Sequence, residues 1–256
     1  MTNEQPTYMD LLIESHLYLE RQGPGSRDVT IRALSFIESP DQVLRIADMG
    51  AGTGGQSMIL AEHTQAEIVC IDLIPEFIER LNENADALGL QDRVKGVAGD
   101  MRSLEFGSDE FDLIWSEGAI DAIGFEQGLT YWNSLLKSGG YVAVTCPSWL
   151  SDERCPEVDE FWLSAGSNLD TIDANITIMQ NAGYSLIATF VLPEECWTDN
   201  YFGPLAEANQ ALLRKYGDSE IVAAYLKDCE SEAELYSRYS RYYGYVFYIG
   251  RKVDVD

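Results

Sequence analysis

The chain has 256 residues, and its 17 lysines and arginines against 43 aspartates and glutamates give a formal net charge of −26. Such a surface repels phosphate backbones, so the composition argues against a protein that binds nucleic acid. The N-terminal residues lack the basic and apolar parts of a signal peptide, and no apolar run is long enough to span a membrane. We therefore expect a cytoplasmic globular protein that does not bind membranes.

The first predicted elements are helices, and strands then alternate with helices. Residues 7–38 are predicted to be helical, with a break at Gly23-Pro24-Gly25. The expected strands are the apolar runs 43–49, 68–71, 94–98, 111–115 and 141–146, and helical patterns lie at about 54–63, 75–88 and 125–137. Strands at this spacing indicate a parallel sheet with helices on both faces.

The second half of the chain is predicted to add helices before a final strand. An irregular stretch is expected from 147 to about 168, followed by a helix that ends near Gly183. The remaining predicted elements are a strand at 184–192, a helix-rich block at about 204–241 and a last strand at 245–251.

A glycine-rich loop, Gly50-Ala51-Gly52-Thr53-Gly54-Gly55, follows the first strand and opens a helix. Its glycines let the backbone turn tightly against a ligand. Gly50, Gly52 and Gly55 also match G-x-G-x-x-G, the dinucleotide fingerprint, and Asp72 ends the next strand, where a carboxylate accepts hydrogen bonds from a ribose diol. A nicotinamide cofactor and S-adenosylmethionine both carry such a ribose, so these features leave both open.

Asp48 favours the second of these cofactors. It lies two residues before the first glycine, where a negative charge is badly placed beside a pyrophosphate. The same charge is well placed near the cationic amino-acid end of S-adenosylmethionine, directly or through water. The alternative is that Asp48 only orders the loop by accepting hydrogen bonds from its amides.

Five motifs in order resemble those of the class I S-adenosylmethionine-dependent methyltransferases, in particular the small-molecule type related to quinone-biosynthesis enzymes. The motifs are the glycine loop from Asp48 to Gly54, Ile71-Asp72-Leu73, Gly99-Asp100-Met101, the run from Phe111 to Ser116, and the run from Leu136 to Val144. The segments 21–26 and 242–247 are also similar to a bacterial and archaeal subgroup of these enzymes.

The resemblance implies a Rossmann-like α/β fold with a seven-stranded, mostly parallel sheet, helices on both faces, extra N-terminal helices and a helical insertion before the last strand. It divides a single methyltransferase domain, residues 1–256, into an N-terminal helical lid (1–40), a cofactor-binding core (41–192), a helical insertion (193–243), and the last strand with its tail (244–256). It implies S-adenosylmethionine as the cofactor, with Asp100 on the adenine amino group and the Met101 amide on the ring. The implied cofactor-binding residues are Asp48, Gly50, Ala51, Gly52, Thr53, Gly54, Asp72, Leu73, Asp100, Met101 and Ser116.

Methyl transfer is an in-line displacement that depends largely on proximity and on the exclusion of water, so a catalytic base is optional. If a proton must leave, Glu117 is the first candidate because it directly follows the fourth strand, and His16 on the expected lid is the second. The alternatives are a loop-ordering carboxylate for Glu117 and a helix histidine with satisfied hydrogen bonds for His16.

Aromatic and acidic residues crowd the segments expected to cover the site. Together they could cage a cationic amine by cation–π attraction or stack on a planar ring, although most are expected to form a core. The aromatic residues are Trp149, Phe161, Trp162, Trp197, Tyr201, Phe202, Tyr239, Tyr242 and Tyr243, and the acids among them are Asp159, Glu160, Glu194 and Glu195.

The expected function is methyl transfer to the N, O, S or C of a small molecule. An NAD-dependent oxidoreductase and a non-catalytic S-adenosylmethionine-binding protein remain as alternatives. A minor alternative is a metalloid (arsenite) methyltransferase, which requires that Cys146, Cys155 and Cys196 converge. The cysteines show no C-x-x-C spacing, so no metal site is predicted. The acceptor and the oligomeric state stay open, with a homodimer as one option.

Overall fold

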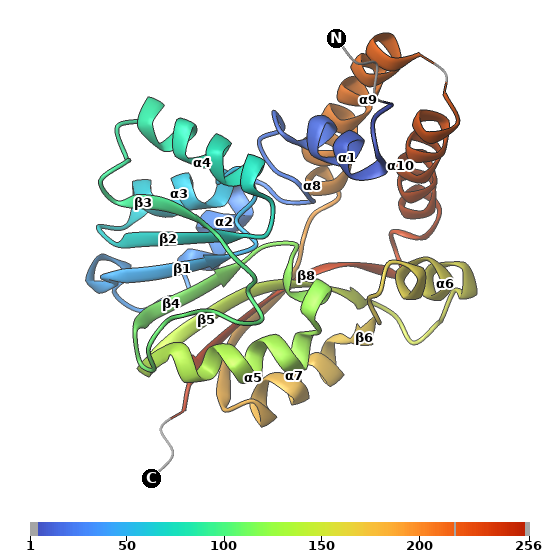
Figure 1. The fold of residues 1–256 in the computed structure, drawn as a ribbon. Helices are drawn as coiled ribbons and strands as arrows, with labels where there is room; N and C mark the ends of the chain where they lie inside the picture. Colours follow the sequence, from blue (N-terminus) through green and yellow to red (C-terminus); the bar gives the residue numbers. More distant parts are fainter. Residues whose placement is uncertain (1–4, 218, 254–256) are drawn as a thin grey trace.

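Eight strands form one sheet in the computed structural model, which describes residues 5–217 and 219–253 (Figure 1). Seven follow the order β3-β2-β1-β4-β5-β8-β7, and the short β6 pairs with β5. Strands β1 to β5 run parallel to one another, whereas β8 runs antiparallel to both of its neighbours, β5 and β7. The strands are β1 (Arg45–Met49), β2 (Glu67–Asp72), β3 (Val94–Ala98), β4 (Phe111–Ser116), β5 (Leu136–Trp149), β6 (Asp170–Thr171), β7 (Tyr184–Val191) and β8 (Tyr243–Lys252).

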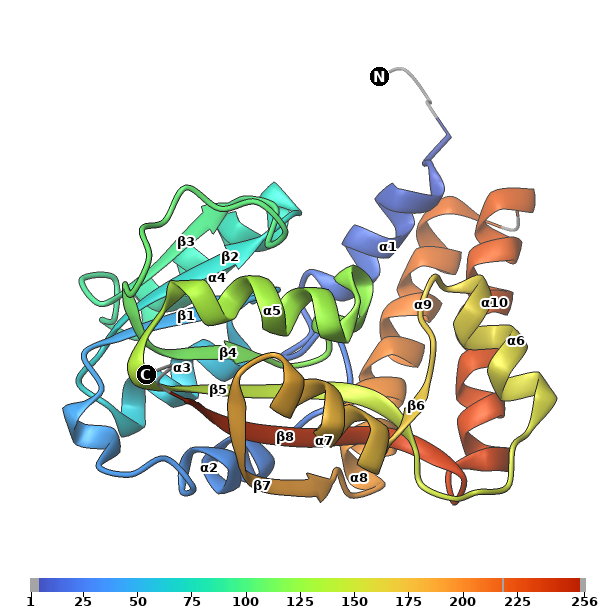
Figure 2. The same ribbon diagram turned by 90° about the horizontal axis from the view of Figure 1, so that it is seen from below.

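Helices cover both faces of the sheet, so its central strands are buried on both sides (Figures 1 and 2). Ile46 of β1 and Leu113 of β4 face one cluster, while Ala47 and Ile114 face the other, as expected for the alternation along a strand. One face carries α2 (Arg27–Leu34), α3 (Gly55–His63) and α4 (Pro75–Ala87), and the other carries α5 (Phe125–Leu135) and α7 (Ile172–Asn181). Two short 3₁₀ turns are η1 (Pro40–Gln42) and η2 (Ile120–Ile123).

Four further helices gather at one end of the sheet, and we call them the cap (Figures 1 and 2). They are α1 (Tyr8–His16), α6 (Pro156–Ser164), α9 (Gly203–Tyr216) and α10 (Glu220–Tyr239), with α8 (Glu195–Trp197) and the π-helical turn η3 (Thr198–Phe202) leading into α9. The helix α10 runs into β8, whose first residue, Tyr243, pairs with Trp149, the last residue of β5. The cap therefore lies beyond the carboxyl end of β5, where ligands bind in open α/β sheets.

The predicted fold class, a mostly parallel sheet with helices on both faces and a helical insertion before the last strand, is confirmed. One detail differs. The stretch 147–168 contains α6, which starts at Pro156, a residue suited to the first helical position because its missing N–H needs no partner there. Of the N-terminal helices, α1 packs against α9 and α10, while α2 packs against α3.

Candidate active site

The glycine loop joins β1 to α3 and turns back sharply over the end of the sheet. The amides of Gly50 and Ala51 both donate to the carbonyl of Ile71, at 2.8 and 2.9 Å. Gly50 has φ +73°, and a Cβ placed there would stand 2.2 Å from the Cβ of Ala119. Glycine is needed at this position both for the left-handed backbone and for the close approach of the next chain segment.

Asp72 lies at the carboxyl end of β2, facing the loop as expected. Its Oδ2 accepts from the Gly52 amide at 2.8 Å, and its Oδ1 accepts from the Ile74 amide at 2.9 Å. Burial raises the pKa of this carboxyl, and the amide donors oppose the rise. Leu73, the next residue, is 68% exposed and lies outside the cavity described below.

A cavity of about 130 Å³, here called the glycine-loop cavity, opens between the loop and the N-terminal segment. Gln22 holds that segment in place, since its Oε1 accepts from the Thr53 amide at 2.8 Å and its Nε2 donates to Thr53 Oγ1 at 2.9 Å. Gly54 lies behind Thr53 as the N-cap of α3. The cavity is lined by Arg21, Gln22, Gly23, Pro24, Gly50, Ala51, Gly52, Gln56, Asp72, Phe77, Glu117, Gly118 and Ala119.

Asp48 does not reach this cavity, which corrects the expectation of a cofactor contact. Its side chain is fully buried, and it accepts hydrogen bonds from Ser57 Oγ and from Gln56 Nε2, both in the first turn of α3. Gln56 in turn donates to the carbonyl of Ala51 and lines the cavity. Asp48 thus ties the loop to the helix that follows it. The contacts agree with the alternative reading, in which Asp48 only orders the loop. The hydrogen-bond donors are side chains, however, and not the loop amides that this reading expected.

Burial raises the pKa of Asp48 from 3.8 to about 7. The folded protein therefore holds this proton more tightly than the unfolded chain, so the contribution of Asp48 to stability falls as the pH rises toward and through 7. From pH 5 to pH 8, Asp48→Asn is expected to lose about 2–3 kcal/mol less unfolding free energy than the wild type. Urea denaturation at the two pH values measures this. Asp121 and Glu232, whose pKa values burial also raises, are common to both proteins. Equal losses in the two proteins would contradict the assignment.

The predicted cofactor residues Ser116, Asp100 and Met101 also lie outside the glycine-loop cavity, as do Thr53 and Gly54. Ser116 is buried, and its hydroxyl donates to the Met49 carbonyl at 2.8 Å, which ties β4 to β1. Asp100 pairs with Arg102 at 2.7 Å, which lowers the pKa of the carboxyl. The Met101 sulfur lies about 4.0 Å from the position that a Cβ of Gly50 would take, so Met101 borders the glycine loop.

Glu117 lines the cavity, but three donors already occupy its buried carboxylate. Arg21 pairs with Oε2 at 2.7 Å, while Thr30 Oγ1 and Trp115 Nε1 donate to Oε1 at 2.7 and 2.9 Å. These contacts use the carboxylate to join the N-terminal segment, α2 and β4. The geometry therefore favours the ordering role over that of a general base. Arg21 and Thr30 had no recognisable partner in the sequence, because 96 and 87 residues separate them from Glu117.

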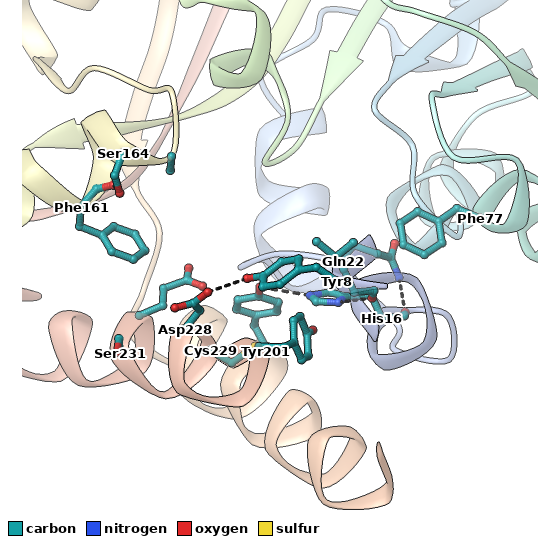
Figure 3. Close-up of a pocket in the computed structure, with 14 residues that line it drawn as sticks. Tyr8, His16, Gln22, Phe77, Phe161, Ser164, Tyr201, Asp228, Cys229 and Ser231 are labelled. Atoms are coloured by element: carbon teal, nitrogen blue, oxygen red, sulfur yellow. Dashed lines mark hydrogen bonds between the residues drawn. The ribbon is translucent and has the colours of Figure 1, made fainter. Parts of the chain in front are cut away.

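His16 lies at the inner end of α1 beside a second, larger cavity of about 580 Å³, here called the cap cavity (Figure 3). Its Nδ1 is 2.9 Å from the Leu12 carbonyl, and its Nε2 is 3.3 Å from the hydroxyl of Tyr201. Burial lowers its pKa, which favours the neutral ring. The cap cavity is lined by Tyr8, Leu12, His16, Gln22, Phe77, Phe161, Ser164, Ala165, Tyr201, Tyr225, Asp228, Cys229, Ser231 and Glu232.

Of the aromatic residues expected over the site, Phe161 and Tyr201 line this cavity, while others, such as Trp149 and Trp197, belong to the buried core. The acids that line it are Asp228 and Glu232 of α10 rather than the predicted ones. The sequence offered no signal for these two, because they lie on a charged helix whose inward face only the packing reveals.

The three cysteines named for a metalloid site do not converge. Cys146 packs into the cluster on the α5 and α7 face of the sheet, whereas Cys155 and Cys196 belong to the cluster on the opposite face. Within residues 5–217 and 219–253, no group of three His, Cys, Asp or Glu side chains could hold a metal ion. The metalloid alternative therefore has no site in the described structure.

Comparison with known proteins identifies the central part of the chain. Residues 46–140 match the family model described as a methyltransferase domain. A sarcosine/dimethylglycine N-methyltransferase of Aphanothece halophytica is 28% identical over 114 residues, which are 44% of this chain and 40% of the relative. A chloroplastic tocopherol O-methyltransferase of Arabidopsis thaliana is 28% identical over 192 residues, which are 73% of this chain and 50% of the relative. The chain thus spans half the length of these two relatives or less.

Solved structures show the same fold. A methyltransferase from Geobacter sulfurreducens, described as S-adenosylmethionine-dependent and solved with S-adenosyl-L-homocysteine, superposes with a TM-score of 0.82. It is 19% identical in sequence, and the match covers 94% of this chain and 97% of the other. Residues 46–140 are therefore similar to a methyltransferase domain, and the chain has the same Rossmann-like fold as this solved structure.

Proposed function

We propose that this protein transfers a methyl group from S-adenosylmethionine to a small-molecule acceptor and releases S-adenosylhomocysteine. The observation that carries the proposal is the glycine loop of the methyltransferase domain, closed against Asp72 by the 2.8 Å hydrogen bond from the Gly52 amide. The relatives support it, since those matched act, by name, on sarcosine or dimethylglycine and on tocopherol.

The side chains of the glycine-loop cavity suit the polar groups of this cofactor. Arg21 lines the cavity, and its buried Nε has no hydrogen-bond partner in the described part of the chain, so it has a donor to spare for a carboxylate. Asp72 lines the same cavity and offers acceptors for a ribose diol. A Cβ at Gly50 would stand 2.2 Å from that of Ala119, and one at Gly52 would stand 2.0 Å from Gln22 Oε1, so only glycine lets the loop pack this closely. We propose Ala51, Thr53 and Gly54 as the rest of the loop that shapes this site.

When bound, S-adenosylmethionine would supply a methyl group on a sulfonium, which needs no further activation. The protein's own contribution is then to bind, orient and exclude water. Gln22 and its neighbours in the N-terminal segment form one wall of the glycine-loop cavity. Gln22 and Phe77 line both this cavity and the cap cavity. We propose that the acceptor occupies the cap cavity and meets the methyl group where these two residues lie. If a proton must leave, we propose His16 as its acceptor, because burial favours the neutral ring and Glu117 is paired with Arg21.

For the remaining cofactor contacts, we propose that Leu73, which is exposed beside Asp72, covers the adenine. Asp100 and Met101 would approach the same ring only after the N-terminal and β3–β4 segments adjust, because Arg102 now holds Asp100. Asp48 and Ser116 would support the loop without contacting the cofactor.

The proposed partner is a small molecule rather than a nucleic acid, since the net charge of −26 repels phosphates. In the described residues no helix is both long and apolar enough to cross a bilayer. The cysteines are all free thiols, which suits the reducing cytoplasm we propose. Self-association into a homodimer is testable by light scattering.

Product formation tests the function. The purified protein, S-adenosylmethionine and a low-molecular-weight metabolite extract should yield S-adenosylhomocysteine, detected by mass spectrometry, in an amount that depends on the extract. Heat-treated protein serves as the control. If the protein binds S-adenosylhomocysteine but no extract yields product, it binds the cofactor without catalysis. Hydride exchange with NAD instead would support the oxidoreductase alternative, which rests on Gly50, Gly52, Gly55 and Asp72.

A further inference from the structure

The cap cavity directly adjoins the glycine-loop cavity. Both are lined by Gln22 and Phe77, so a molecule in the cap cavity touches the same side chains that border the cofactor site. In Figure 3 these two residues lie on one side of the cavity and Phe161 and Ser164 of α6 on the other. This position makes the cap cavity the natural site for the methyl acceptor, and its lining then indicates the acceptor's chemistry.

Three tyrosines line the cap cavity, and each of their hydroxyls lies within hydrogen-bond distance of another side chain of the protein. The hydroxyl of Tyr8 donates to Asp228 Oδ2 at 3.0 Å, and that of Tyr201 lies 3.3 Å from His16 Nε2. The hydroxyl of Tyr225 pairs with Ser15. With these groups occupied, what remains for a ligand is mainly the electron-rich surface of the rings, which attracts cations.

The charged groups of the lining are both acids. Asp228 and Glu232 come from α10, and the described lining residues include no lysine or arginine, while His16 favours its neutral form. Among the described residues, Glu232 has no hydrogen-bond or ion-pair partner. Burial alone raises its pKa to about 7, because no nearby donor or cation stabilises the charged form. A carboxylate in this state is stabilised most by a positive group brought by a ligand.

From these features we propose that the cap cavity binds the acceptor through a positively charged amine, with Glu232 as the counter-ion and the rings of Tyr8, Tyr201 and Phe161 around it. An anionic acceptor would meet two carboxylates, and a neutral apolar one would leave Glu232 without a partner. The identification of this cavity as the acceptor site rests on the proposed methyl transfer, but the binding of an organic cation does not.

Choline and its uncharged isostere 3,3-dimethylbutan-1-ol separate charge from shape. At pH 8 we expect calorimetry to show that the wild type binds choline at least about tenfold more tightly than the isostere. Glu232→Gln should reduce this preference to less than about threefold, because choline loses its counter-ion while the isostere does not. Glu230→Gln is the matched control, because it removes one charge from the same helix at an exposed position outside the cap cavity. It should keep the preference.

The preference of the wild type should also rise about tenfold between pH 6 and pH 8, because choline keeps its charge while Glu232 ionises. The titratable groups that interact with Glu232 or line the cap cavity with it are Tyr8, His16, Tyr201, Tyr225, Asp228, Cys229, Tyr243 and Tyr245. Of these groups, His16 is the one whose ordinary pKa, 6.5, lies between pH 6 and pH 8. His16→Asn should therefore retain the rise, and Glu232→Gln should lose it.

Equal binding of choline and the isostere by the wild type would overturn the proposal, as would an unchanged preference in Glu232→Gln. A preference lost equally in Glu230→Gln would also overturn it, since the overall charge of the protein would then account for the effect. The same titrations with S-adenosylhomocysteine present keep the two ideas apart. If the protein binds S-adenosylhomocysteine but does not discriminate between the two probes, only this inference fails. If choline discrimination persists without S-adenosylhomocysteine binding, the proposed function fails.

Discussion

Arg21→Met is expected to destabilise the folded protein by about 3–5 kcal/mol, because it leaves the buried carboxylate of Glu117 without its cation. The side chains of Arg21 and Glu117 are 5% and 3% exposed, and their 2.7 Å ion pair joins the N-terminal segment to the end of β4. The loss should appear as a lower urea midpoint with little change in slope. Binding of S-adenosylhomocysteine should weaken as well, since both residues line the glycine-loop cavity.

Two further variants test the cause. Arg21→Met with Glu117→Gln removes both charges, so it should recover a substantial part of the lost stability. Arg80→Met breaks an exposed pair with Glu83 and should cost less than about 1 kcal/mol. A loss below about 1 kcal/mol in Arg21→Met, or no recovery in the double variant, would show that the buried pair is not what holds the segment.

Gly50→Ala is expected to abolish measurable cofactor binding and to destabilise the protein by about 2–5 kcal/mol. The new Cβ would stand 2.2 Å from that of Ala119, in a backbone with φ +73°. Neither group is the end of a flexible side chain, so the loop or the segment after β4 must move. Either movement opens the contact between the loop and Asp72 that the cofactor site requires.

Gly89→Ala provides a matched control. Gly89 has a similar φ of +69°, but a Cβ there would meet nothing within 4 Å, so only the backbone cost of about 1–2 kcal/mol remains. Its affinity for S-adenosylhomocysteine should stay at the wild-type value, measured by titration calorimetry. If Gly50→Ala binds as well as Gly89→Ala, the close packing of the loop does not shape the cofactor site.

The elements around the loop could be predicted from the sequence because their signals are local. The run 43–49 is mostly apolar, as a central strand buried on both faces is, the glycines follow at once, and Asp72 comes where the next strand ends. These features lie within 30 residues of each other and depend on backbone geometry, which residue type and spacing specify directly.

The roles of individual carboxylates could not be predicted, because those roles depend on distant partners. Glu117 was located correctly at the end of β4, but Arg21, 96 residues away, makes it part of a buried ion pair. Asp48 has the same sequence context whether it faces a ligand or the helix behind it, and only packing places it on Ser57. Glu232 gave no signal at all, since one acid on a charged helix resembles its neighbours until the fold turns it inward.

The central claim is that the glycine loop and Asp72 hold an adenosyl cofactor, and titration calorimetry with S-adenosylhomocysteine, S-adenosylmethionine and NAD tests it most directly. The two adenosyl compounds should bind with micromolar affinity and NAD should not bind. Asp72→Ala should weaken their binding by at least about tenfold, as expected for lost charge-assisted hydrogen bonds. Asp86→Ala, at an exposed position on α4, should not. Absence of adenosyl binding, or a clear preference for NAD, would contradict the account and make the loop a dinucleotide site.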